Sequence, residues 1–523
     1  MAGIIALLSR ELLLYFIYFG VGVMEIKKQE RLEERFESAW KNRESEDCLW
    51  WDGSWWSWNR LNSLAIDCEE KLKEAGFQKG QRIAFILPNS PIVIALSLAC
   101  WKLGGAVAPV NARAGHENLR GTLQVLDPAA VFVSEGNELS GCVFEGTKFG
   151  IFTVTPDKLI QQFKCVKGIE EMEDHAVIFS TSGTSGRPKA VPCTHSNLLS
   201  NIDPIKKHVP GLLDRDSIIL NVLPNFHSFG FNISGMLALM SGCRQTLLPG
   251  FVPVDHTIDA IKASGANCII GVPTIMVFLL GALSKKGERL SGIKFVITGG
   301  DRLNVQMNLR SKEYLGTGIL EGYGLTECSP VVAVGHSADD SRLGTVGQFF
   351  DTYEVQIRDM NDRILDMHEE GVLWVKGPSV VSGYFRDEVN TSERFVDGWF
   401  NTGDVVRVDK DGYVQIVDRA TDIIIVSGFN VYPQEVENAL CKHPAVQSAA
   451  VVGEKNRLAG EIVKAFVILK EGKKTTEKEL IDYCKKNLAH YKVPRRIGFL
   501  EEFPISAAGK VLRRELRKIE IDK

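Results

Sequence analysis

Hydroxyl and glycine residues are concentrated in one ten-residue stretch that could hold a phosphate. The stretch STSGTSGRPK runs from Ser180 to Lys189, directly after the apolar run Ala176-Val-Ile-Phe179. Residues of these types do not pack a core, but their backbone N–H groups and hydroxyls can fold around a phosphate, and Lys189 adds a positive charge. The stretch is therefore predicted to be a loop that binds a nucleotide.

A Walker A loop is the nearest alternative for such a stretch. That motif has the pattern G-x-x-x-x-G-K-[ST] and opens a helix directly after its last glycine. Here Gly186 is followed by Arg187-Pro188-Lys189, and Pro188 prevents a helix from starting as the motif requires. A P-loop NTPase is excluded, whereas a Ser/Gly-rich surface connection stays open on composition alone.

Further motifs along the chain favour the nucleotide. They are Tyr323-Gly-Leu-Thr-Glu327, Thr402-Gly-Asp404 and Gly509-Lys510. Each is weak evidence alone, because a Thr-Glu or Gly-Asp pair is usually a cap or a turn. In this order, and together with the loop, they resemble the adenylate-forming superfamily of acyl-CoA and acyl-ACP synthetases, peptide-synthetase adenylation domains and luciferases.

The resemblance implies a two-step reaction on a carboxylic acid. The carboxylate attacks the α-phosphate of ATP to give an acyl-adenylate and pyrophosphate, and a thiol then takes the acyl group while AMP leaves. Both steps build negative charge on oxygen, so the site needs cations and oriented donors rather than an enzyme nucleophile. Cys328, beside Glu327, is therefore not expected to be catalytic.

The resemblance also implies which residues hold ATP and Mg²⁺. Thr326 would donate to the α-phosphate, and Glu327 would ligate Mg²⁺, which suits a carboxylate together with phosphate oxygens. Lys510 would bridge the substrate carboxylate and the α-phosphate, two anions that otherwise repel. The β- and γ-phosphates would be held by Thr181, Ser182, Gly183, Thr184 and Lys189.

The adenosine contacts are implied in the same way. Tyr323 would stack on adenine, and the turn Gly299-Gly300-Asp301-Arg302 would lie along the edge of the base. Asp404 would accept both ribose hydroxyls, because one carboxylate has two oxygens for two donors. Arg419 would add a contact to the same sugar.

The acyl pocket is expected between Pro224 and Met240. Amino-acid-activating relatives have Phe-Asp where this chain has Phe231-Asn232, and without that carboxylate a substrate ammonium would be buried unpaired. An amino acid is therefore disfavoured, and Gly235 is expected to leave room for the methylene chain of a fatty acid. His227 is expected either near the substrate carboxylate or as a structural histidine in the pocket wall.

The acyl acceptor is a thiol whose carrier the sequence does not fix. The phrases Phe226-His-Ser-Phe-Gly230 and 326–332 resemble the acyl-activating half of bacterial 2-acylglycerophosphoethanolamine acyltransferase/acyl-ACP synthetases. We therefore expect transfer of a long-chain fatty acid to the phosphopantetheine thiol of acyl carrier protein (ACP), with CoA as the alternative. Gly428 would line the thiol tunnel, where a side chain would block a narrow passage.

A cluster of basic residues could meet either carrier. It would face an acidic carrier protein or the phosphates of CoA, so charge does not decide between them. Its members are Lys485, Lys486, Lys492, Arg495, Arg496, Arg513 and Arg514. A non-catalytic membrane scaffold is the alternative of another class, and it is disfavoured because Lys189, Glu327, Asp404 and Lys510 are all present.

Alternating strands and helices are predicted to bring these residues together. The predicted strands are 82–87, 105–110, 176–179, 217–222, 245–248, 268–272 and 295–298. This is the α/β pattern of a doubly wound parallel sheet covered on both faces, whose ligands lie beyond the carboxyl ends of the strands. Shorter strands at 354–357, 372–375, 405–408 and 413–416 predict an antiparallel barrel-like unit, and Asp52-Gly53 between tryptophans predicts a hairpin.

The resemblance implies a mobile α+β C-terminal domain that carries Lys510 over the site. The chain departs from the family at the hinge, where Thr421 stands in place of the usual Asp or Lys. The expected parts are an apolar segment 1–24, an adenylate-forming domain 25–417, a hinge 418–422 and the mobile domain 423–523.

Composition and the first residues bear on partners and location. The formal net charge of −4 does not indicate a nucleic-acid-binding protein. The 11 cysteines form no C-x-x-C pair, which favours reduced thiols in a cytosolic chain. Segment 1–24 is apolar but carries interior charges, so we expect a peripheral contact at the cytosolic face of a membrane, with docking on the protein's own surface as the alternative.

Overall fold

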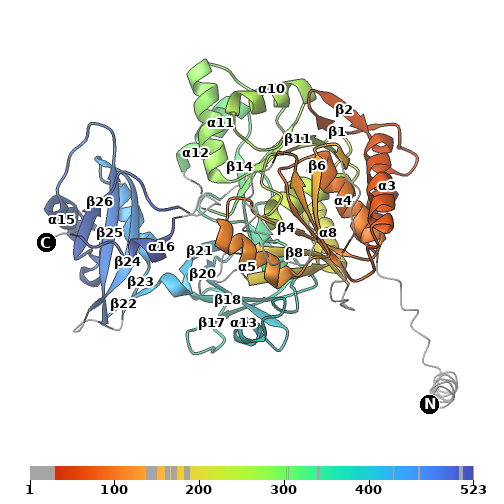
Figure 1. Ribbon diagram of the computed structural model, residues 1–523. Coiled ribbons are helices and arrows are strands. Elements are labelled where there is room, and N and C mark those ends of the chain that lie inside the picture. Colours follow the sequence, from red (N-terminus) through yellow and green to blue (C-terminus); the bar gives the residue numbers. More distant parts are fainter. Residues whose placement is uncertain are drawn as a thin grey trace, which may run out of the picture.

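The structure is a computed structural model of the 523-residue chain. It describes residues 30–136, 150–159, 165, 174–181, 189–301, 303, 305–338, 342–427, 429–456, 460–505 and 511–521. Segment 1–24 lies outside the described residues, as do five residues of the predicted site: Ser182, Gly183, Thr184, Gly428 and Lys510. Within the described part of the chain, the strands form four sheets (Figure 1).

One sheet carries the predicted phosphate loop at one edge. Its order is β7-β6-β5-β3-β4-β8-β9, with β3 parallel to both β4 and β5, as predicted. Only β7 and β9 run antiparallel to their neighbours. The strands are β3 (Arg82–Ile86), β4 (Ala106–Pro109), β5 (Ala130–Ser134), β6 (Gly150–Thr155), β7 (Lys158–Leu159), β8 (His175–Thr181) and β9 (Lys189–Thr194).

Helices cover both faces of this sheet, as expected for parallel strands. Phe85 of β3 lies in the large core that contains α4 (Pro91–Lys102), whereas Ile86 packs with α5 (His116–Leu126) on the other face. Helix α4 is buried from Pro91 to Trp101, which matches its apolar character all round. Successive side chains of β3 therefore pack against the two helical layers, one on each face of the sheet.

A second sheet continues the parallel pattern. Its order is β16-β15-β14-β13-β12-β10-β11-β1-β2, and β11, β10, β12, β13 and β14 are parallel to one another. The strands are β1 (Asp47–Trp51), β2 (Ser54–Ser57), β10 (Ile218–Asn221), β11 (Arg244–Leu247), β12 (Cys268–Gly271), β13 (Phe295–Gly299), β14 (Ile319–Gly324), β15 (Val331–Val334) and β16 (Gln348–Phe349). The predicted α/β fold class is confirmed.

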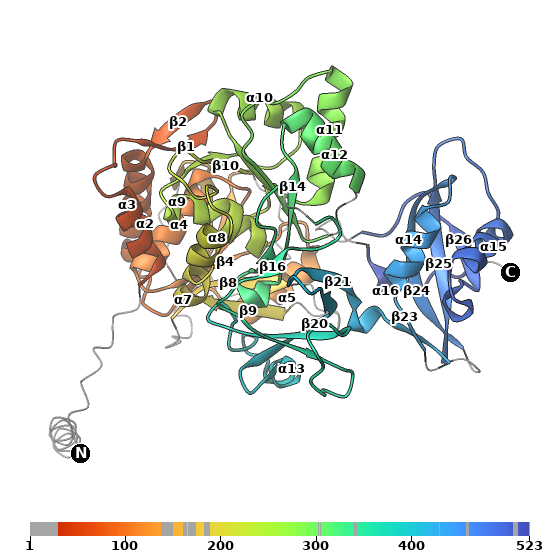
Figure 2. The same cartoon turned by 180° about the vertical axis from the view of Figure 1, so that it is seen from behind.

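The helices around this sheet follow the predicted alternation. They are α2 (Leu32–Trp40), α3 (Trp58–Glu74), α7 (His195–Leu199), α8 (Ile202–His208), α9 (Leu237–Met240), α10 (Val254–Ser264), α11 (Pro273–Lys286) and α12 (Val305–Leu315). Figures 1 and 2 show α10, α11 and α12 together on one side of the large body. Among the described residues, no helix has the length and apolar character needed to cross a bilayer.

The tryptophan-rich segment forms the predicted hairpin. Asp52 and Gly53 both have positive φ, 47° and 77°, as a two-residue type I′ turn requires. Trp50 and Trp56 are buried, and β1 pairs in parallel with β11. Packing within the protein therefore accounts for these two tryptophans.

The third sheet is antiparallel, as predicted. Its described strands do not close into a barrel. Strand β20 pairs with β18 along one edge, while β19 and β21 share its other edge. The elements are β17 (Glu354–Arg358), β18 (Gly371–Lys376), α13 (Glu388–Arg394), β19 (Phe395–Val396), β20 (Trp399–Val408) and β21 (Val414–Arg419).

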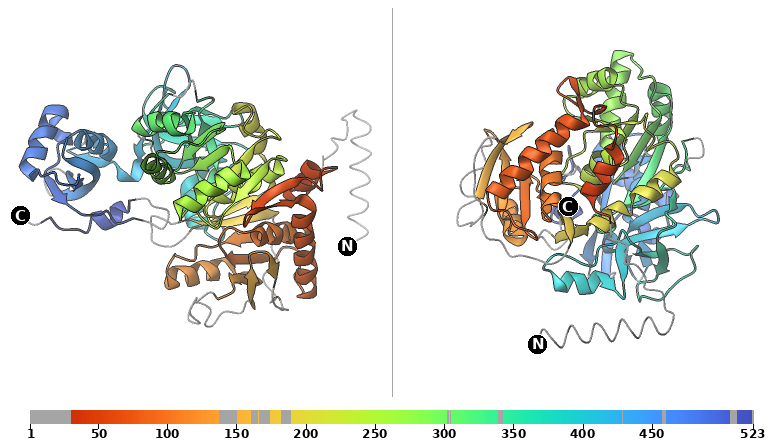
Figure 3. Two further views of the ribbon diagram at one scale, coloured as in Figure 1. Left: turned by 90° about the horizontal axis from the view of Figure 1, so that it is seen from above. Right: turned by 90° about the vertical axis from the view of Figure 1, so that its right-hand side faces the viewer.

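The last sheet and its helices have apolar cores of their own. Val451 and Val463 lie in a cluster whose members all come from residues 424–497. Figures 2 and 3 show this blue part at the opposite end of the molecule from α2 and α3. Its elements are β22 (Ile424–Val426), β23 (Phe429–Val431), α14 (Pro433–Cys441), β24 (Val446–Asn456), β25 (Gly460–Leu469), α15 (Glu477–Asn487), β26 (Arg496–Phe499) and α16 (Arg513–Leu516).

Candidate active site

The predicted nucleotide residues gather at the carboxyl ends of strands from both large sheets. Strand β8 ends at Thr181, β13 ends at Gly299, and β14 ends at Gly324. The short 3₁₀ helix η2 (Thr326–Cys328) follows β14, and Sγ of Cys193 on β9 lies 3.9 Å from the carbonyl oxygen of Thr326. The two sheets therefore meet beside η2, at the edge where an α/β sheet binds its ligand.

The phosphate loop joins the ends of an antiparallel hairpin. Thr181 on β8 is opposite Lys189 on β9, and the Thr181 hydroxyl donates to the Lys189 carbonyl at 3.4 Å. The loop itself, 182–188, lies outside the described residues. The described part of the hairpin fixes where the loop begins and ends.

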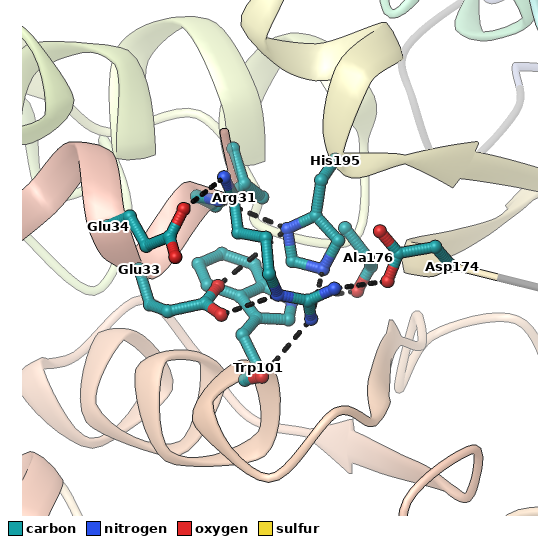
Figure 4. Close-up of polar contacts among 8 residues, drawn as sticks. Arg31, Glu33, Glu34, Trp101, Asp174, Ala176 and His195 are labelled. Carbon is teal, nitrogen blue, oxygen red and sulfur yellow. Dashed lines mark hydrogen bonds and ion pairs between the residues drawn. The ribbon is translucent and has the colours of Figure 1, made fainter. Parts of the chain in front are cut away.

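A partly buried arginine holds the other end of this hairpin (Figure 4). The Arg31 guanidinium pairs with Asp174, which precedes β8, and its Nη2 lies 2.9 Å from Nε2 of His195, which follows β9. Trp101 of α4 donates its indole N–H to the Ala176 carbonyl on β8 at 2.8 Å. These contacts anchor both strands to α2 and α4, and no local sequence pattern predicted them.

Three predicted adenosine residues lie together. Tyr323 donates its hydroxyl to Oδ2 of Asp404 at 2.6 Å, and Nε of Arg419 lies 3.1 Å from Oδ1. The Asp404 side chain is 4% exposed and that of Arg419 is 54% exposed, so the pair reaches from the interior to the surface. Burial and the neighbouring Asp404 carboxylate raise the pKa of Tyr323 well above its usual value, which keeps its hydroxyl protonated. Stacking of Tyr323 on adenine stays a prediction.

A second arginine shapes the turn that presents Asp404. Gly403 has a φ of +71°, and the Thr402 hydroxyl donates to the Leu373 carbonyl at 2.8 Å. Arg394 donates from Nη2 to the Thr402 carbonyl at 2.8 Å and from Nε to the Asn401 carbonyl at 2.7 Å. Arg394 was not expected from the sequence, because its contacts are to backbone atoms in a neighbouring strand.

The predicted metal ligand Glu327 and the loop lysine Lys189 both contact one tyrosine, Tyr384. The Tyr384 hydroxyl donates to Oε1 of Glu327 at 2.8 Å, and Nζ of Lys189 lies 4.7 Å from the centre of the Tyr384 ring. Burial, and after it the nearby Arg394 guanidinium, lowers the pKa of Lys189. Tyr384 follows β18 in an irregular segment, and no sequence motif marked it.

Thr326 connects the nucleotide residues to the predicted acyl pocket. Its hydroxyl oxygen lies 3.0 Å from that of Ser228, at the start of the π-helix η1 (Phe229–Met236). Asn232 on η1 donates its amide to the Ser329 carbonyl at 2.7 Å. Helix η1 is therefore fastened to the loop that carries Thr326 and Glu327.

The predicted pocket residues on η1 serve its packing. Phe231 is 2% exposed, and its ring centre lies 5.7 Å from that of Phe179 and 6.5 Å from that of Phe85. A Cβ on Gly235 would lie 2.9 Å from the Gly230 carbonyl oxygen. Close backbone approach accounts for this glycine, whereas we expected it to leave space. The roles of Phe231, Asn232 and Gly235 toward an acyl chain stay predictions.

The remaining predicted residues lie nearer the surface. Gly300 follows β13 with a φ of +84°, and Asp301 after it is exposed. His227 is exposed, and its Nδ1 accepts the backbone N–H of Phe229 at 3.2 Å. Cys328, by contrast, is fully buried, and burial raises the pKa of its thiol well above its usual value.

The donor set fits ATP and a magnesium ion that the reaction class implies. Among the described residues, no group of three or more His, Cys, Asp or Glu residues could hold a metal by itself. Mg²⁺ bound by one carboxylate plus phosphate oxygens needs no such group. Glu327 is partly exposed, and the described residues donate no hydrogen bond to its Oε2. That oxygen could take the metal.

The basic cluster of the C-terminal part is largely paired within the chain. Arg513 Nη2 lies 2.7 Å from Glu437 and Arg517 Nη2 lies 3.0 Å from Asp422, so α16 is attached to the predicted hinge. Other members pair with nearby carboxylates: Lys485 with Asp482, Lys492 with Glu435, Arg496 with Glu454, and Arg514 with Glu515. Most members of the cluster thus have a carboxylate of this chain nearby, and several of these pairs are exposed.

Two family descriptions match the chain. The family of AMP-binding enzymes matches residues 36–385, and the family of AMP-binding enzyme C-terminal domains matches residues 435–510. Together they include the residues on η2, on the phosphate hairpin and on strands β24, β25 and β26 of the C-terminal sheet.

Known proteins resemble the chain along most of its length. A long-chain-fatty-acid–CoA ligase of Bacillus subtilis (strain 168) is 30% identical over 487 residues, or 86% of this chain and 87% of that protein. A ligase of the same name from Salmonella typhimurium is 36% identical over 348 residues, or 66% of this chain and 62% of that protein.

Solved structures resemble the chain over most of its length. ATP-bound MatB from Rhodopseudomonas palustris is 26% identical with a TM-score of 0.83, covering 94% of this chain and 99% of its own. The o-succinylbenzoate CoA synthetase MenE from Bacillus subtilis, in complex with its acyl-adenylate intermediate, is 25% identical with a TM-score of 0.81 and the same coverage. Both likenesses extend over the large sheets and the C-terminal sheet.

Proposed function

Because the chain belongs to the family of AMP-binding enzymes, we propose that it is an AMP-forming ligase that activates a long-chain fatty acid with ATP and transfers the acyl group to CoA. The observation that carries this proposal is the buried Asp404 carboxylate bonded to Tyr323 of β14, the strand that leads into η2 with Glu327, while Tyr384 contacts both Glu327 and Lys189. One carboxylate there can accept both hydroxyls of a ribose, while a carboxylate and an ammonium remain for the metal and the phosphates.

In the first step the chain's residues orient two anions toward each other. Asp404 would hold the ribose, Lys189 and the loop would hold the β- and γ-phosphates, and the Thr326 hydroxyl would donate to the α-phosphate. Glu327 would hold Mg²⁺, which neutralises phosphate charge. The fatty-acid carboxylate then attacks the α-phosphorus and pyrophosphate leaves, so this step needs no proton transfer to the enzyme.

Lys510 and the hinge complete the proposal. Lys510 would bridge the carboxylate and the α-phosphate when the part after 418–422 closes over the site. The hinge includes Asp422, which α16 holds through Arg517 at 3.0 Å, so this contact connects the hinge to the segment that follows Lys510. In the second step the thiolate attacks the acyl carbonyl carbon, the bond to AMP breaks, and Gly428 would leave space for the thiol.

CoA is favoured over acyl carrier protein as the acceptor, although the sequence alone favoured the carrier protein. Relatives named long-chain-fatty-acid–CoA ligases support CoA, whereas the basic cluster suits either carrier and does not decide between them. Assays with ATP, Mg²⁺ and palmitate would compare CoA with holo-ACP. Thioester on CoA is expected, and thioester formed only on holo-ACP would overturn this choice.

The reaction itself is tested by pyrophosphate release. The full chain with ATP and Mg²⁺ should release pyrophosphate only when a long-chain fatty acid is present, and Lys510→Ala should release much less. Lys410→Ala, which changes an exposed lysine in the turn between β20 and β21, is the control and should behave as wild type. Release that is independent of the fatty acid, or unchanged in Lys510→Ala, would contradict the proposal.

Segment 1–24 is proposed to make a peripheral contact at the cytosolic face of a membrane. Its apolar residues and its interior charges support a contact with the interface rather than a span. Sedimentation of the full chain and of a chain lacking 1–24 with anionic phospholipid vesicles tests the contact. Only the full chain should sediment with the vesicles, and equal sedimentation would exclude the proposal.

A further inference from the structure

Tyr384 is attached to both sides of the proposed phosphate and metal site. Its hydroxyl donates to Oε1 of Glu327 at 2.8 Å, and the Lys189 ammonium lies 4.7 Å from its ring centre. The backbone of the same segment makes two more bonds: Val381 N donates to the Glu327 carbonyl at 2.9 Å, and Phe385 N donates to the Ala190 carbonyl at 2.8 Å. The segment 381–385 therefore bridges the residue that would bind the metal and the strand that carries the loop lysine.

The segment is itself fixed by α13. The backbone N–H of Tyr384 donates to the Thr391 hydroxyl at 2.9 Å, and that hydroxyl donates to the Asp387 carbonyl at 2.7 Å. A Cβ on Gly383 would overlap the Thr391 side chain, so this close approach requires glycine. The Tyr384 side chain is buried, and its ring packs edge-on against Phe395 at 5.5 Å between centres. A side chain held at this many points has little freedom to leave Glu327.

The tyrosine keeps two opposite charges close without letting them neutralise each other. Among the described residues, no carboxylate lies within ion-pair distance of Lys189, although Glu327 accepts a hydrogen bond from the hydroxyl of the same tyrosine. A ring face attracts an ammonium through its quadrupole, and a hydroxyl hydrogen bond orients a carboxylate without cancelling its charge. Both charged groups thus stay available for a ligand, the carboxylate for a cation and the ammonium for a polyanion.

We infer that Tyr384 is a positioning residue for the magnesium–triphosphate part of the substrate. It holds Glu327 by its hydroxyl and Lys189 by its ring, so that the carboxylate would take the cation and the ammonium would face the phosphates. This inference rests on the proposed function. Groups that orient a metal ligand typically affect metal affinity by about 10- to 100-fold when they are removed.

The two contacts of Tyr384 can be separated by substitution. Tyr384→Phe removes the hydroxyl bond to Glu327 and keeps the ring under Lys189, with the packing against Phe395 unchanged. Tyr384→Leu removes both contacts. Tyr314→Phe is the matched control, because its hydroxyl donates to Ser284 at 3.0 Å on the exposed side of α12.

Binding is measured by isothermal titration of α,β-methylene-ATP at a series of Mg²⁺ concentrations, which needs no turnover. Tyr384→Phe should raise the Mg²⁺ concentration for half-maximal binding by roughly tenfold, with binding in the absence of Mg²⁺ unchanged. Tyr384→Leu should in addition weaken binding without Mg²⁺, because Lys189 loses its support. In the fatty-acid assay both should raise KM for ATP and leave KM for the fatty acid unchanged.

The outcome separates this inference from the proposed function. If Tyr384→Phe binds the analogue with the Mg²⁺ dependence of wild type and Tyr314→Phe, the tyrosine serves packing alone and the inference is wrong. Failure of wild type to use a fatty acid, with the Mg²⁺ shift present, would instead contradict the substrate and leave Tyr384 in its positioning role. A thermal melt of each variant shows whether the fold is retained, and Tyr384→Phe decides the case if Tyr384→Leu does not fold.

Discussion

Arg419 pairs with Asp404 across the β20–β21 ladder, with Nε 3.1 Å from Oδ1, and Arg419 itself lies in the predicted hinge 418–422. The carboxylate is buried, whereas the guanidinium is half-exposed. Asp404, the proposed ribose acceptor, is thus held by Arg419, a residue of the segment that leads to the C-terminal part. Nucleotide binding and the position of the hinge therefore share one side-chain contact.

Substitution of Asp404 should affect ATP and spare the fatty acid. Asp404→Asn keeps the shape but loses one of two acceptor oxygens and the charge that faces Arg419, so KM for ATP should rise by about 10- to 100-fold, which corresponds to about 1.4 to 2.7 kcal/mol. KM for palmitate should not change. Steady-state pyrophosphate release with each substrate varied measures both values.

The control for this variant lies on the same sheet. Glu370→Gln removes an exposed pair with Arg407 of β20, at 3.5 Å, and should leave both KM values unchanged. An Asp404→Asn enzyme with the wild-type KM for ATP would remove Asp404 from the ribose site.

A methyl group on Gly230 should disrupt the acyl-pocket helix. A Cβ there would overlap the Pro224 carbonyl oxygen, and that atom is backbone with little room to move. Gly230→Ala is expected to lower the free energy of unfolding by about 1 to 3 kcal/mol, as overpacking does. Chemical denaturation monitored by circular dichroism measures the change.

A helical glycine in open space provides the matched control. Gly281 lies within α11, and no neighbouring atom comes within 4 Å of the position that an added methyl group would take. Gly281→Ala should therefore leave stability unchanged or raise it by about 0.5 to 1 kcal/mol. Equal effects of the two substitutions would mean that close packing does not explain Gly230.

The sequence predicted the parts of the fold that depend on local pattern. The buried runs of β3, β8 and β13 and the Asp52-Gly53 turn are specified by apolar runs and turn residues, and all four are present. The motif residues Tyr323 and Asp404 were expected at one ligand, and the structure joins them by a hydrogen bond although 81 positions separate them.

The residues that hold the site together could not be found in the same way. Tyr384 and Arg394 act through contacts to Glu327 and to the backbone of Thr402, and neither lies in a motif. Arg31 reaches His195 across 164 positions, a contact that exists only once α2 packs beside the hairpin. Such contacts depend on how elements are packed rather than on local periodicity, so a single sequence gives no signal for them.

The buried histidine at the base of the phosphate hairpin should make stability depend on pH. Burial, and after it the Arg31 guanidinium, lowers the pKa of His195 to about 4 from an ordinary value of 6.5. Glu33, Glu34 and Asp174 are the acidic groups near it, and Trp101 closes the remaining side. Because the folded-state pKa is the lower one, the unfolded chain binds the proton more readily.

This difference contributes stability that is fully present above pH 6.5 and is lost as the pH falls toward 4. The contribution amounts to about 3 kcal/mol over that window. His195→Gln cannot take up the proton, so its stability relative to wild type should improve by this amount between pH 7 and 4. Urea denaturation of both proteins across this range measures the difference, and parallel curves would mean that His195 does not titrate in the window.

Arg513 and Glu437 form the ion pair that holds α16. Removing Arg513 alone should reduce stability more than removing both residues. Glu437 is 6% exposed and accepts from Arg513 at 2.7 Å, and burial raises the pKa of Glu437 despite the neighbouring cation. Arg513→Met leaves that carboxyl without its cation and should destabilise the C-terminal part by roughly 3 kcal/mol. Adding Glu437→Met should restore much of the loss, because two apolar groups replace a buried pair.

A double-mutant cycle in urea, monitored by hydrogen exchange of β24 amides, measures the coupling. Lys485→Met, which breaks an exposed pair with Asp482 on α15, should change stability by less than about 0.5 kcal/mol and serves as the control. Since α16 begins three positions after Lys510, loss of the pair should also slow pyrophosphate release in Arg513→Met, and the double variant should recover part of the rate. Additive effects of the two substitutions would show that Arg513 and Glu437 act independently. The proposed link between the segment that carries Lys510 and α14, which carries Glu437, would then be wrong.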